Sequence, residues 1–424
     1  MEQYAWLKLD NAAKIYPPAS TSKWMALFRV SAELTEPIDP KILKLALAST
    51  LDRFPSFAMR LRGGMFWYYL EHIDALPDIE SDVKNPCIRM NFKKNKGFMF
   101  RVRYHNNRIA VEIYHVLTDG TGGLCFLKTL VAEYLRFKYG ADIPRNASIL
   151  DCEQLPKREE FEDSFLRFAG EEKTSFKEAQ SYLIKGVRDD RHYMNIITGI
   201  APSEIVQSKA KEYGASVTVF LTAVLIESIC EFQKKELRKT QRRMPVKICI
   251  PINLRRFFPS VTLRNFASYA NPGIEPRLGD YEFKEIVDSI NHQLALEINK
   301  KRLNAKFTSN VLIEKNKLMR LAPLFIKKYA MRVGFMVNGD KFTSSIISNL
   351  GLVTLPPEMS RYVNRIDFML GSLSVNPVTC ACLSYNGSMM ISFTRTIIDP
   401  KVERGFFTRL VKMGIPVKVE SNQR

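Results

Sequence analysis

The stretch that decides the fold runs from Ile113 to Gly123 and reads IYHVLTDGTGG. It places His115 at the end of an apolar strand, Asp119 four residues later, and glycines that let the backbone turn sharply before a helix. An imidazole can take a proton from an alcohol or amine at neutral pH, which is the general-base step of acyl transfer. The same residues also fit a hydrogen-bonded histidine at a strand end followed by an Asp-Gly turn.

Regular elements are expected before and after this stretch. Apolar periodicity, helix caps and turn residues predict an α+β unit in the first part of the chain. In order we expect a strand over Met25–Leu34, a helix capped by Asp39 that ends near Asp52, a hairpin of Phe57–Arg62 and Met65–Glu71 turning at Gly63-Gly64, a hairpin of Phe98–His105 and Arg108–His115 turning at Asn106-Asn107, and a helix over Leu124–Tyr139 ended by Gly140.

The second part of the chain also shows a mixture of helix and strand patterns. A polar, charged stretch from Ala141 to about Arg191 lacks a core pattern, so it is expected to connect two domains, 1–165 with the histidine and 166–424 with the connection. The elements expected after it are helices near Ser203–Tyr213, Val217–Phe232 (capped by Ser216), Tyr281–Arg302 and Val311–Val333, strands at Val246–Ile252, 343–349, 361–369, 372–383 and 388–396, and a last helix.

Composition and targeting signals indicate a folded intracellular protein. Of the 424 residues, 46% are hydrophobic and 25% are charged, as in globular proteins. The opening MEQYAWLKLD lacks the basic and apolar regions of a secretory signal, and the seven cysteines have no paired spacing. Turn residues at Asn376-Pro377 and Asn386-Gly387 interrupt the one long uncharged stretch, so no membrane span is expected. We expect a cytoplasmic location.

The net charge of +19 is compatible with three kinds of partner: nucleic acid, an anionic membrane face and a phosphate-bearing ligand. The basic residues form separate clusters near residues 93–103, 234–243 and 300–302, and none makes a known nucleic-acid module. They fit solvated surfaces as well as an anion-attracting one. We expect no nucleic-acid partner, leave a peripheral membrane contact open, and infer nothing about the oligomeric state.

Several motifs of well-known enzyme classes are absent from the sequence. It contains no Walker loop, no G-x-G-x-x-G, no G-x-S-x-G and no H-E-x-x-H, which disfavours NTPases, Rossmann oxidoreductases and ordinary serine hydrolases. The five histidines and the scattered cysteines show no zinc-ligand spacing. We expect no metal and no permanently bound cofactor.

The pattern H-x-x-x-D-G, formed by His115, Asp119 and Gly120, resembles the signature of the CoA-dependent acyltransferase superfamily. This superfamily includes chloramphenicol acetyltransferase, plant alcohol acyltransferases, wax ester synthases and nonribosomal condensation domains. Further similar stretches follow the superfamily's order and, with the motif, cover most of the chain: LDRFPSFAMRLRGG at Leu51–Gly64, a segment with NLR, a proline and a later asparagine at Ile250–Pro272, and ISNLG at Ile347–Gly351.

The resemblance implies an α+β fold of two chloramphenicol-acetyltransferase-like lobes with an active-site tunnel between them. His115 would be the general base, and Asp119 would hold the loop in shape through a salt bridge to an arginine. The first choice for that arginine is Arg255, and the alternatives are Arg256, Arg53 and Arg60.

At two places the sequence differs from particular members of the superfamily, and these differences narrow the type of enzyme that it resembles. Tyr114 stands where condensation domains usually carry a first histidine, and SNLG at 348–351 replaces the D-F-G-W-G box of the plant enzymes. A free-standing microbial alcohol or lipid acetyltransferase is therefore the most similar type.

The resemblance implies transfer of an acetyl or other short acyl group from acyl-CoA to a small-molecule or lipid alcohol or amine. The motif offers a base but no activated nucleophile, so direct transfer without an acyl-enzyme is expected, with Cys125 in the core. Candidates for substrate binding and oxyanion stabilisation are Asn253, Ser348 and Asn349. Alternatives are a condensation-like enzyme using a carrier-protein thioester, a non-catalytic binding scaffold of the same fold, and a basic lipid- or nucleic-acid-associating protein.

Overall fold

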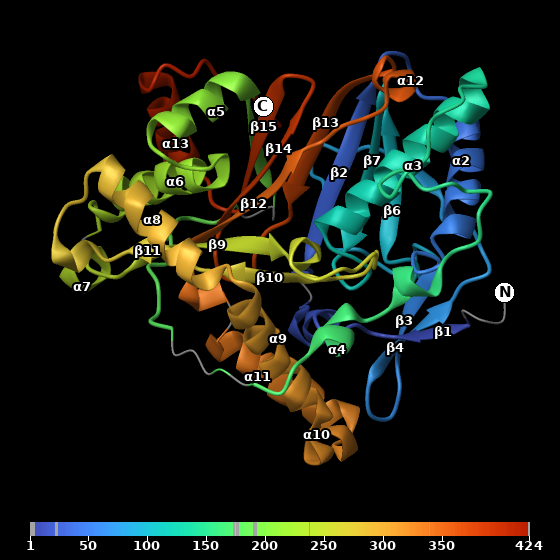
Figure 1. The fold of residues 1–424 in the computed structure, drawn as a ribbon, viewed down its shortest axis with the longest axis horizontal. Helices are drawn as coiled ribbons and strands as arrows, with labels where there is room; N and C mark the ends of the chain where they lie inside the picture. Colours follow the sequence, from blue (N-terminus) through green and yellow to red (C-terminus); the bar gives the residue numbers. More distant parts are fainter. Residues whose placement is uncertain are drawn as a thin grey trace.

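The computed structural model describes residues 5–21, 24–172, 174, 178–189, 193–236, 238–338 and 340–422. Within this part of the chain, the strands form sheets of five, eight and three strands. The two larger sheets belong to two lobes, and each lobe has its own helices (Figure 1). The predicted α+β fold of two lobes is confirmed.

The N-terminal lobe is built on the five-stranded sheet, whose strands are, in sheet order, β13 (Val363–Leu370), β2 (Leu27–Leu34), β7 (Arg108–Tyr114), β6 (Phe100–His105) and β5 (Ile79–Ser81). The helices α2 (Pro40–Arg53) and α3 (Gly120–Tyr139) cover one face of it (Figure 1). Asp39 caps α2 by accepting hydrogen bonds from two backbone N–H groups, and Asn106 takes a φ of 49° in the β6–β7 turn. Both features were predicted.

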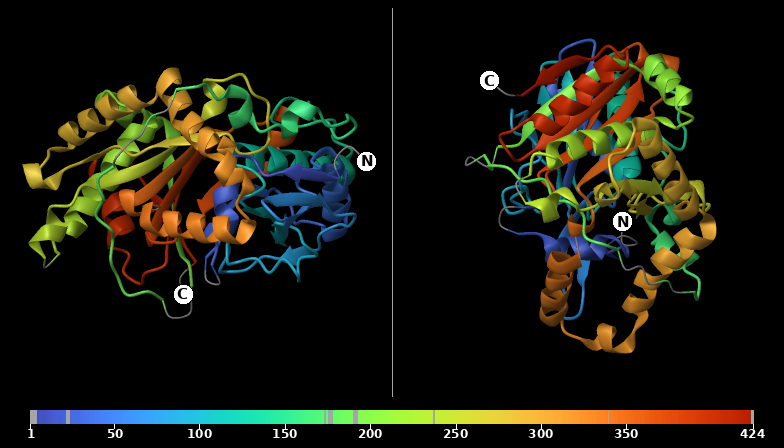
Figure 2. Two further views of the ribbon diagram at one scale, coloured as in Figure 1. Left: turned by 90° about the horizontal axis from the view of Figure 1, so that it is seen from below. Right: turned by 90° about the vertical axis from the view of Figure 1, so that its left-hand side faces the viewer.

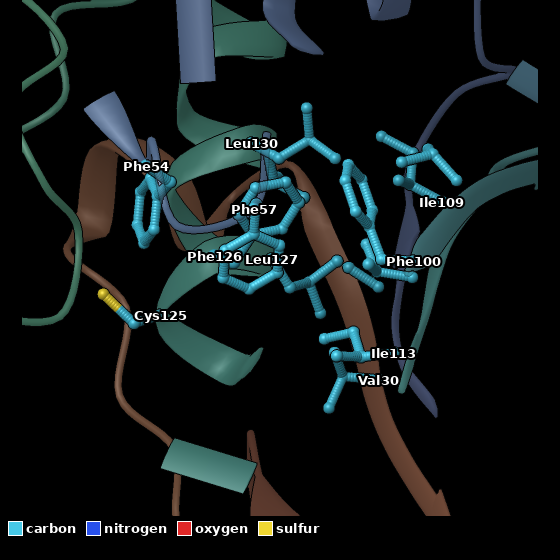
Figure 3. Close-up of a cluster of buried hydrophobic side chains, with 14 of the residues drawn as sticks. Val30, Phe54, Phe57, Phe100, Ile109, Ile113, Cys125, Phe126, Leu127 and Leu130 are labelled. Atoms are coloured by element: carbon cyan, nitrogen blue, oxygen red, sulfur yellow. The ribbon is translucent and has the colours of Figure 1, made fainter. Parts of the chain in front are cut away.

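Aromatic rings fill the space between this sheet and its helices (Figure 3). Phe57 and Phe126 stack with ring centres 4.2 Å apart, and Phe54 and Phe100 meet them edge to face. All four side chains are buried. Because burial of large apolar side chains is the dominant stabilising effect, this cluster holds α3 firmly against the sheet.

The C-terminal lobe is built on the eight-stranded sheet. Its strands are, in sheet order, β10 (Ala267–Ala270), β9 (Val246–Asn253), β12 (Ser345–Leu352), β14 (Val378–Tyr385), β15 (Ser388–Arg395), β8 (Asn195–Pro202) and β16 (Lys418–Ser421), with β11 (Gly273–Ile274) paired to β9. The helices that pack together over this sheet are α5 (Ser203–Glu212), α6 (Val217–Gln233), α8 (Phe283–Glu297) and α13 (Lys401–Lys412) (Figure 1). Ser216 caps α6, as predicted.

The prediction of two long helices between residues 281 and 333 was wrong. After α8 the chain forms α9 (Lys300–Lys315), α10 (Lys317–Leu321) and α11 (Leu324–Asn338). Asn299 caps α9 by accepting a hydrogen bond from the N–H of Arg302, and Pro323 stands between α10 and α11. Both residue types favour helix boundaries. Helices α9 to α11 extend away from the two sheets (Figure 2).

Other predicted boundaries were wrong for local reasons. Helix α3 starts at Gly120 rather than Leu124, because Asp119 caps it. Gly63 pairs with Tyr68, so the turn between β3 (Met59–Gly63) and β4 (Tyr68–His72) comprises residues 64–67 rather than Gly63-Gly64. Strand β14 starts at Val378 rather than residue 372. The eight-residue strand β8 and the short strands β1 (Trp6–Lys8), β5, β10, β11 and β16 were missed. The short ones have too few residues to show periodicity.

The segment predicted as a polar connection packs against both lobes. Glu160 forms a buried ion pair with Arg53 of α2, with nitrogen–oxygen distances of 2.6 and 2.7 Å. Its carbonyl oxygen accepts a hydrogen bond from the N–H of Leu263 at 2.8 Å. Phe165, in α4 (Ser164–Phe168), is buried in the C-terminal core. The predicted end of the connection at Arg191 lies outside the described residues.

One strand crosses between the lobes. Strand β13 follows β12 along the chain, yet it pairs antiparallel with β2, with Phe368 opposite Val30. The N-terminal sheet therefore contains residues from both predicted domains, and the boundary between 165 and 166 stays a prediction.

No single helix among the described residues is long and apolar enough to cross a membrane. Helices α5 and α6 pass that test only as a pair bent by 80°. The remaining short helices are α1 (Tyr16–Ala19), α7 (Lys239–Arg242) and α12 (Pro357–Ser360).

We expect Gly122→Ala to destabilise the protein by about 1–3 kcal/mol, a typical effect of overpacking. A Cβ at this position would lie 2.1 Å from the Thr118 hydroxyl and 2.3 Å from the carbonyl oxygen of Leu263. Gly334→Ala in α11 is the matched control, since its Cβ would meet open space. Urea unfolding measures both variants, and equal effects would contradict the close packing at Gly122.

Candidate active site

A cavity of about 480 Å³ lies between the lobes. Its walls come from the end of β7 and the start of α3 on one side and from β9 and β12 on the other, with β2 and β13 beside them. All the predicted site residues except Arg255 line it, namely His115, Asp119, Gly120, Asn253, Ser348 and Asn349. The two lobes thus bring together residues that are far apart in the sequence.

The imidazole of His115 is held between two aromatic rings. His115 follows β7 directly, and its backbone N–H donates to the carbonyl oxygen of Ala26 at 2.9 Å. The imidazole stacks on Tyr16 with ring centres 5.0 Å apart, and Phe28 meets it edge to face at 5.2 Å. Because the ring is half-buried between these neighbours and also lines the cavity, its orientation is restricted.

A hydrogen bond to Asn265 indicates which nitrogen of His115 carries the proton. His115 Nδ1 lies 2.9 Å from Asn265 Oδ1. The amide nitrogen of Asn265 donates to the carbonyl oxygen of His115 at 3.0 Å and to Asp10 Oδ2 at 3.2 Å, so the amide oxygen is left to accept. Nδ1 must therefore be the protonated nitrogen, which leaves the lone pair on Nε2 to act as a base.

Asp10 supports Asn265 from behind. Its carboxylate is fully buried, accepts a hydrogen bond from the N–H of Ala13 at 2.7 Å, and lies 3.5 Å from the guanidinium of Arg264. Burial raises the pKa of Asp10, and the positive charge of Arg264 opposes that shift. The chain from Asp10 through Asn265 to His115 fixes the imidazole at both its ring nitrogen and its backbone.

Asp119 uses both carboxylate oxygens to hold the loop. Its Oδ1 accepts hydrogen bonds from the N–H groups of Thr121 and Gly122, both at 3.1 Å, and so caps α3. Its Oδ2 accepts from Arg255 Nη1 at 2.7 Å and from the N–H of Phe266 at 2.9 Å. These contacts agree with a structural role for Asp119 rather than a role in proton transfer.

The predicted ion pair between Asp119 and Arg255 is present. Arg255 also donates to the carbonyl oxygens of Thr262 (2.9 Å) and Arg264 (2.6 Å), so its guanidinium joins the start of α3 to the segment that carries Asn265. The alternative arginines lie elsewhere. Arg53 pairs with Glu160, Arg60 pairs with Glu71, and Arg256 lines the cavity.

The other predicted residues shape the cavity wall. A Cβ on Gly120 would lie 2.8 Å from the Leu350 side chain, so glycine allows the close approach of α3 and β12. Asn253 and Asn349 donate to the hydroxyl groups of Thr121 and Thr218, at 3.2 and 3.1 Å. Ser348 lines the cavity beside Asn349.

Cys125 is buried in α3, as expected of a core residue. Burial raises the pKa of its thiol to about 12, so the thiolate is not formed at neutral pH. Among the described residues, no three or more His, Cys, Asp or Glu side chains gather as a metal site would require. That the site needs no metal remains a prediction.

Sequence reasoning missed Asn265, Asp10, Tyr16 and Phe28. Asn265 lies in the Ile250–Pro272 stretch, whose later asparagine was the one available signal. Asp10 and Tyr16 come from the first residues of the chain, where no motif marks them.

The sequence matches no protein-family model and no curated protein. Solved structures match over almost the whole chain. TRI101 from F. sporotrichioides, solved with coenzyme A and T-2, has 11% identity and a TM-score of 0.65, with 99% of this chain and 100% of that chain covered. TRI3 trichothecene 15-O-acetyltransferase from Fusarium sporotrichioides has 8% identity and a TM-score of 0.61, with coverages of 96% and 94%.

The first condensation domain of the CDA synthetase also matches, with 12% identity, a TM-score of 0.57, and coverages of 96% of this chain and 95% of that domain. At such low identities the likeness shows the fold alone. The chain shares the two-lobed fold of these acetyltransferase and condensation-domain structures, as the resemblance implied.

We expect Asp119→Asn and Arg255→Ala each to destabilise the protein by about 2–4 kcal/mol, because each leaves a buried partner unpaired. The double variant should lose about 1–3 kcal/mol less than the sum of the two single losses, because the two residues stabilise the protein through one shared interaction. Urea unfolding of the four proteins measures the cycle. Arg256→Ala is the matched control and should not couple to Asp119. Additive losses for Arg255 would contradict the role of the ion pair.

In a reaction that uses His115 as a general base, we expect Asn265→Ala to lower kcat/KM by about 10–100-fold, the effect of losing a hydrogen bond to an imidazole that becomes charged. Nitrogen-15 NMR should show His115 as the Nδ1–H tautomer in the wild type and as a mixture in the variant. Asn291→Ala, which loses one amide hydrogen bond on α8, should change neither quantity. An unchanged tautomer would rule out this positioning role.

Proposed function

We propose that the protein transfers an acetyl or other short acyl group from acyl-CoA to a hydroxyl or amine acceptor, with His115 as general base. The observation that carries the proposal is the hydrogen bond between His115 Nδ1 and Asn265 Oδ1, which leaves Nε2 free at the wall of the cavity between the lobes. A base held in one orientation beside a cavity is what acyl transfer to an alcohol requires.

The proposed reaction is a direct transfer. His115 Nε2 takes the proton of the acceptor O–H or N–H while that oxygen or nitrogen attacks the thioester carbonyl carbon. The tetrahedral intermediate then collapses, the carbon–sulfur bond breaks, and the leaving thiolate takes the proton from the imidazolium. Asn265 Oδ1 stabilises the imidazolium by accepting its Nδ1–H. Cys125 cannot serve as a nucleophile because its buried thiol stays protonated.

The oxyanion of the intermediate needs a donor in the cavity wall. Asn253 and Asn349 already use one amide N–H each to bond threonine hydroxyls, which leaves each a second N–H. The Ser348 hydroxyl, on the same wall, is the third candidate. We propose that one of these groups donates to the oxyanion.

Two structural neighbours support the choice of donor and acceptor. TRI101 was solved with coenzyme A and T-2, and TRI3 is a trichothecene 15-O-acetyltransferase. The net charge of +19 and the arginine at position 256 in the cavity wall suit a donor that carries phosphates. The proposed enzyme works with acyl-CoA as co-substrate, without a permanently bound cofactor or nucleic acid, and in the cytoplasm.

A condensation-like reaction with a carrier-protein thioester is the second candidate, favoured by the structural match to a condensation domain. Tyr114 at the place of the first histidine favours the free CoA donor instead. A non-catalytic scaffold of the same fold is the third candidate.

We expect His115→Ala to lower the rate of acyl transfer by about 10²–10⁴-fold, the usual contribution of a general base. Steady-state rates with acetyl-CoA and a panel of alcohols and amines measure this loss, and circular dichroism checks the fold. His292→Ala, an exposed histidine on α8, is the matched control and should keep full activity. Turnover only with carrier-protein thioesters would favour the condensation reaction. Full turnover by a folded His115→Ala protein would contradict the assignment of His115 as the general base.

A further inference from the structure

Helices α10 and α11 expose a row of large apolar side chains. Five of them are at least two-fifths exposed, and we call them the α10–α11 surface: Leu321, Phe325, Ile326, Tyr329 and Val333. Phe325 and Tyr329 are each 73% exposed. The spacing of four residues from Phe325 to Tyr329 and Val333 places these three in one row along α11.

The segment around this surface is strongly basic. From Lys315 to Phe335 the chain has six Lys or Arg residues and no Asp or Glu. Lys328 and Arg332 are exposed and each follow a residue of the row by three positions, so they flank the apolar row on α11. An apolar row beside cations, with no acidic residue, is complementary to an anionic lipid surface.

The opposite side of α11 is anchored to the protein body. Lys327 is buried, its Nζ donates to the carbonyl oxygen of Phe66 at 3.0 Å, and it lies 3.7 Å from the ring centre of Trp67. The N–H of Leu324 donates to the carbonyl oxygen of Met65 at 2.8 Å. Met65, in the β3–β4 turn, is 76% exposed and extends the apolar area next to α11. The surface is therefore held in place by the N-terminal lobe.

The same helix reaches the catalytic cavity. The ring of Phe335 stacks on Trp24 with ring centres 5.7 Å apart, and both residues line the cavity. Helix α11 thus carries the exposed apolar row from Phe325 to Val333, and two residues farther along, Phe335 forms part of the cavity wall. The helix lies with α9 and α10 outside the two sheets, at one end of the molecule (Figures 1 and 2).

We propose that the α10–α11 surface docks on a bilayer that contains anionic lipids, and that the cavity then receives an alcohol acceptor from the lipid phase. The second step rests on the acyl transfer proposed above. The apolar side chains enter the interface between headgroups and acyl chains, and Lys328 and Arg332 contact anionic headgroups.

Sedimentation with phosphatidylcholine vesicles, with and without phosphatidylglycerol, tests the docking. We expect binding that depends on phosphatidylglycerol and falls by about tenfold or more in Phe325→Glu/Tyr329→Glu and in Lys328→Glu/Arg332→Glu. Leu155→Glu changes a leucine that is 87% exposed outside this surface and should bind as the wild type does. Binding that is absent, or equal in all variants, would overturn the proposal. So would a wild-type dimer that Phe325→Glu/Tyr329→Glu converts to a monomer, since the surface would then serve self-association.

Activity assays test the lipid-phase acceptor separately. Phe325→Glu/Tyr329→Glu should keep the wild-type rate with a short soluble alcohol and lose at least about tenfold with a long-chain alcohol embedded in vesicles, in line with its weaker binding. Equal losses with both alcohols would overturn the lipid-phase acceptor. His115→Ala should bind vesicles normally, so a failure of the proposed chemistry and a failure of docking give different results.

Discussion

The carboxylate of Asp119 is the interaction on which the rest of the site depends. A buried carboxylate is tolerated only when donors satisfy its oxygens, and here four do so: two N–H groups of α3, the N–H of Phe266 and the guanidinium of Arg255. The first two belong to the N-terminal lobe and the others follow β9 in the C-terminal lobe. A single side chain therefore caps the helix after the His115 loop and joins the two lobes at the cavity.

The position of the proposed base follows from this junction. Phe266 is the neighbour of Asn265, so the hydrogen bond from its N–H to Asp119 also sets Asn265 beside the imidazole. A neutral amide orients His115 without placing a negative charge against it, and the buried Asp10 lies one hydrogen bond farther away. The loop, the lobe interface and the tautomer of the histidine thus form one connected network, in which each part restricts the next.

Helix α11 also connects the cavity with the exposed α10–α11 surface. Helix α11 contributes Phe335 to the cavity wall and the stretch from Phe325 to Val333 to an apolar, basic surface, and its buried Lys327 is anchored against the β3–β4 turn. The helices that carry this surface are the part of the fold that sequence periodicity described least well. The breaks at Asn299, Asn316 and Pro323 make α8, α9, α10 and α11 separate helices, and this allows α11 to turn back toward Trp24.

The sequence by itself determined many of the local elements and the motif that contains His115 and Asp119. Caps, turns and periodicity act between near neighbours, so Asp39, Asn106 and the strands around His115 were predicted, and the H-x-x-x-D-G resemblance predicted the fold. Only the tertiary structure decided the pairing of β13 with β2 and the use of Asn265 to orient His115. Asn265 lies 150 residues from His115 and 255 from Asp10. Which of many asparagines meets the imidazole depends on how the two lobes pack, and no local pattern in the chain records that packing.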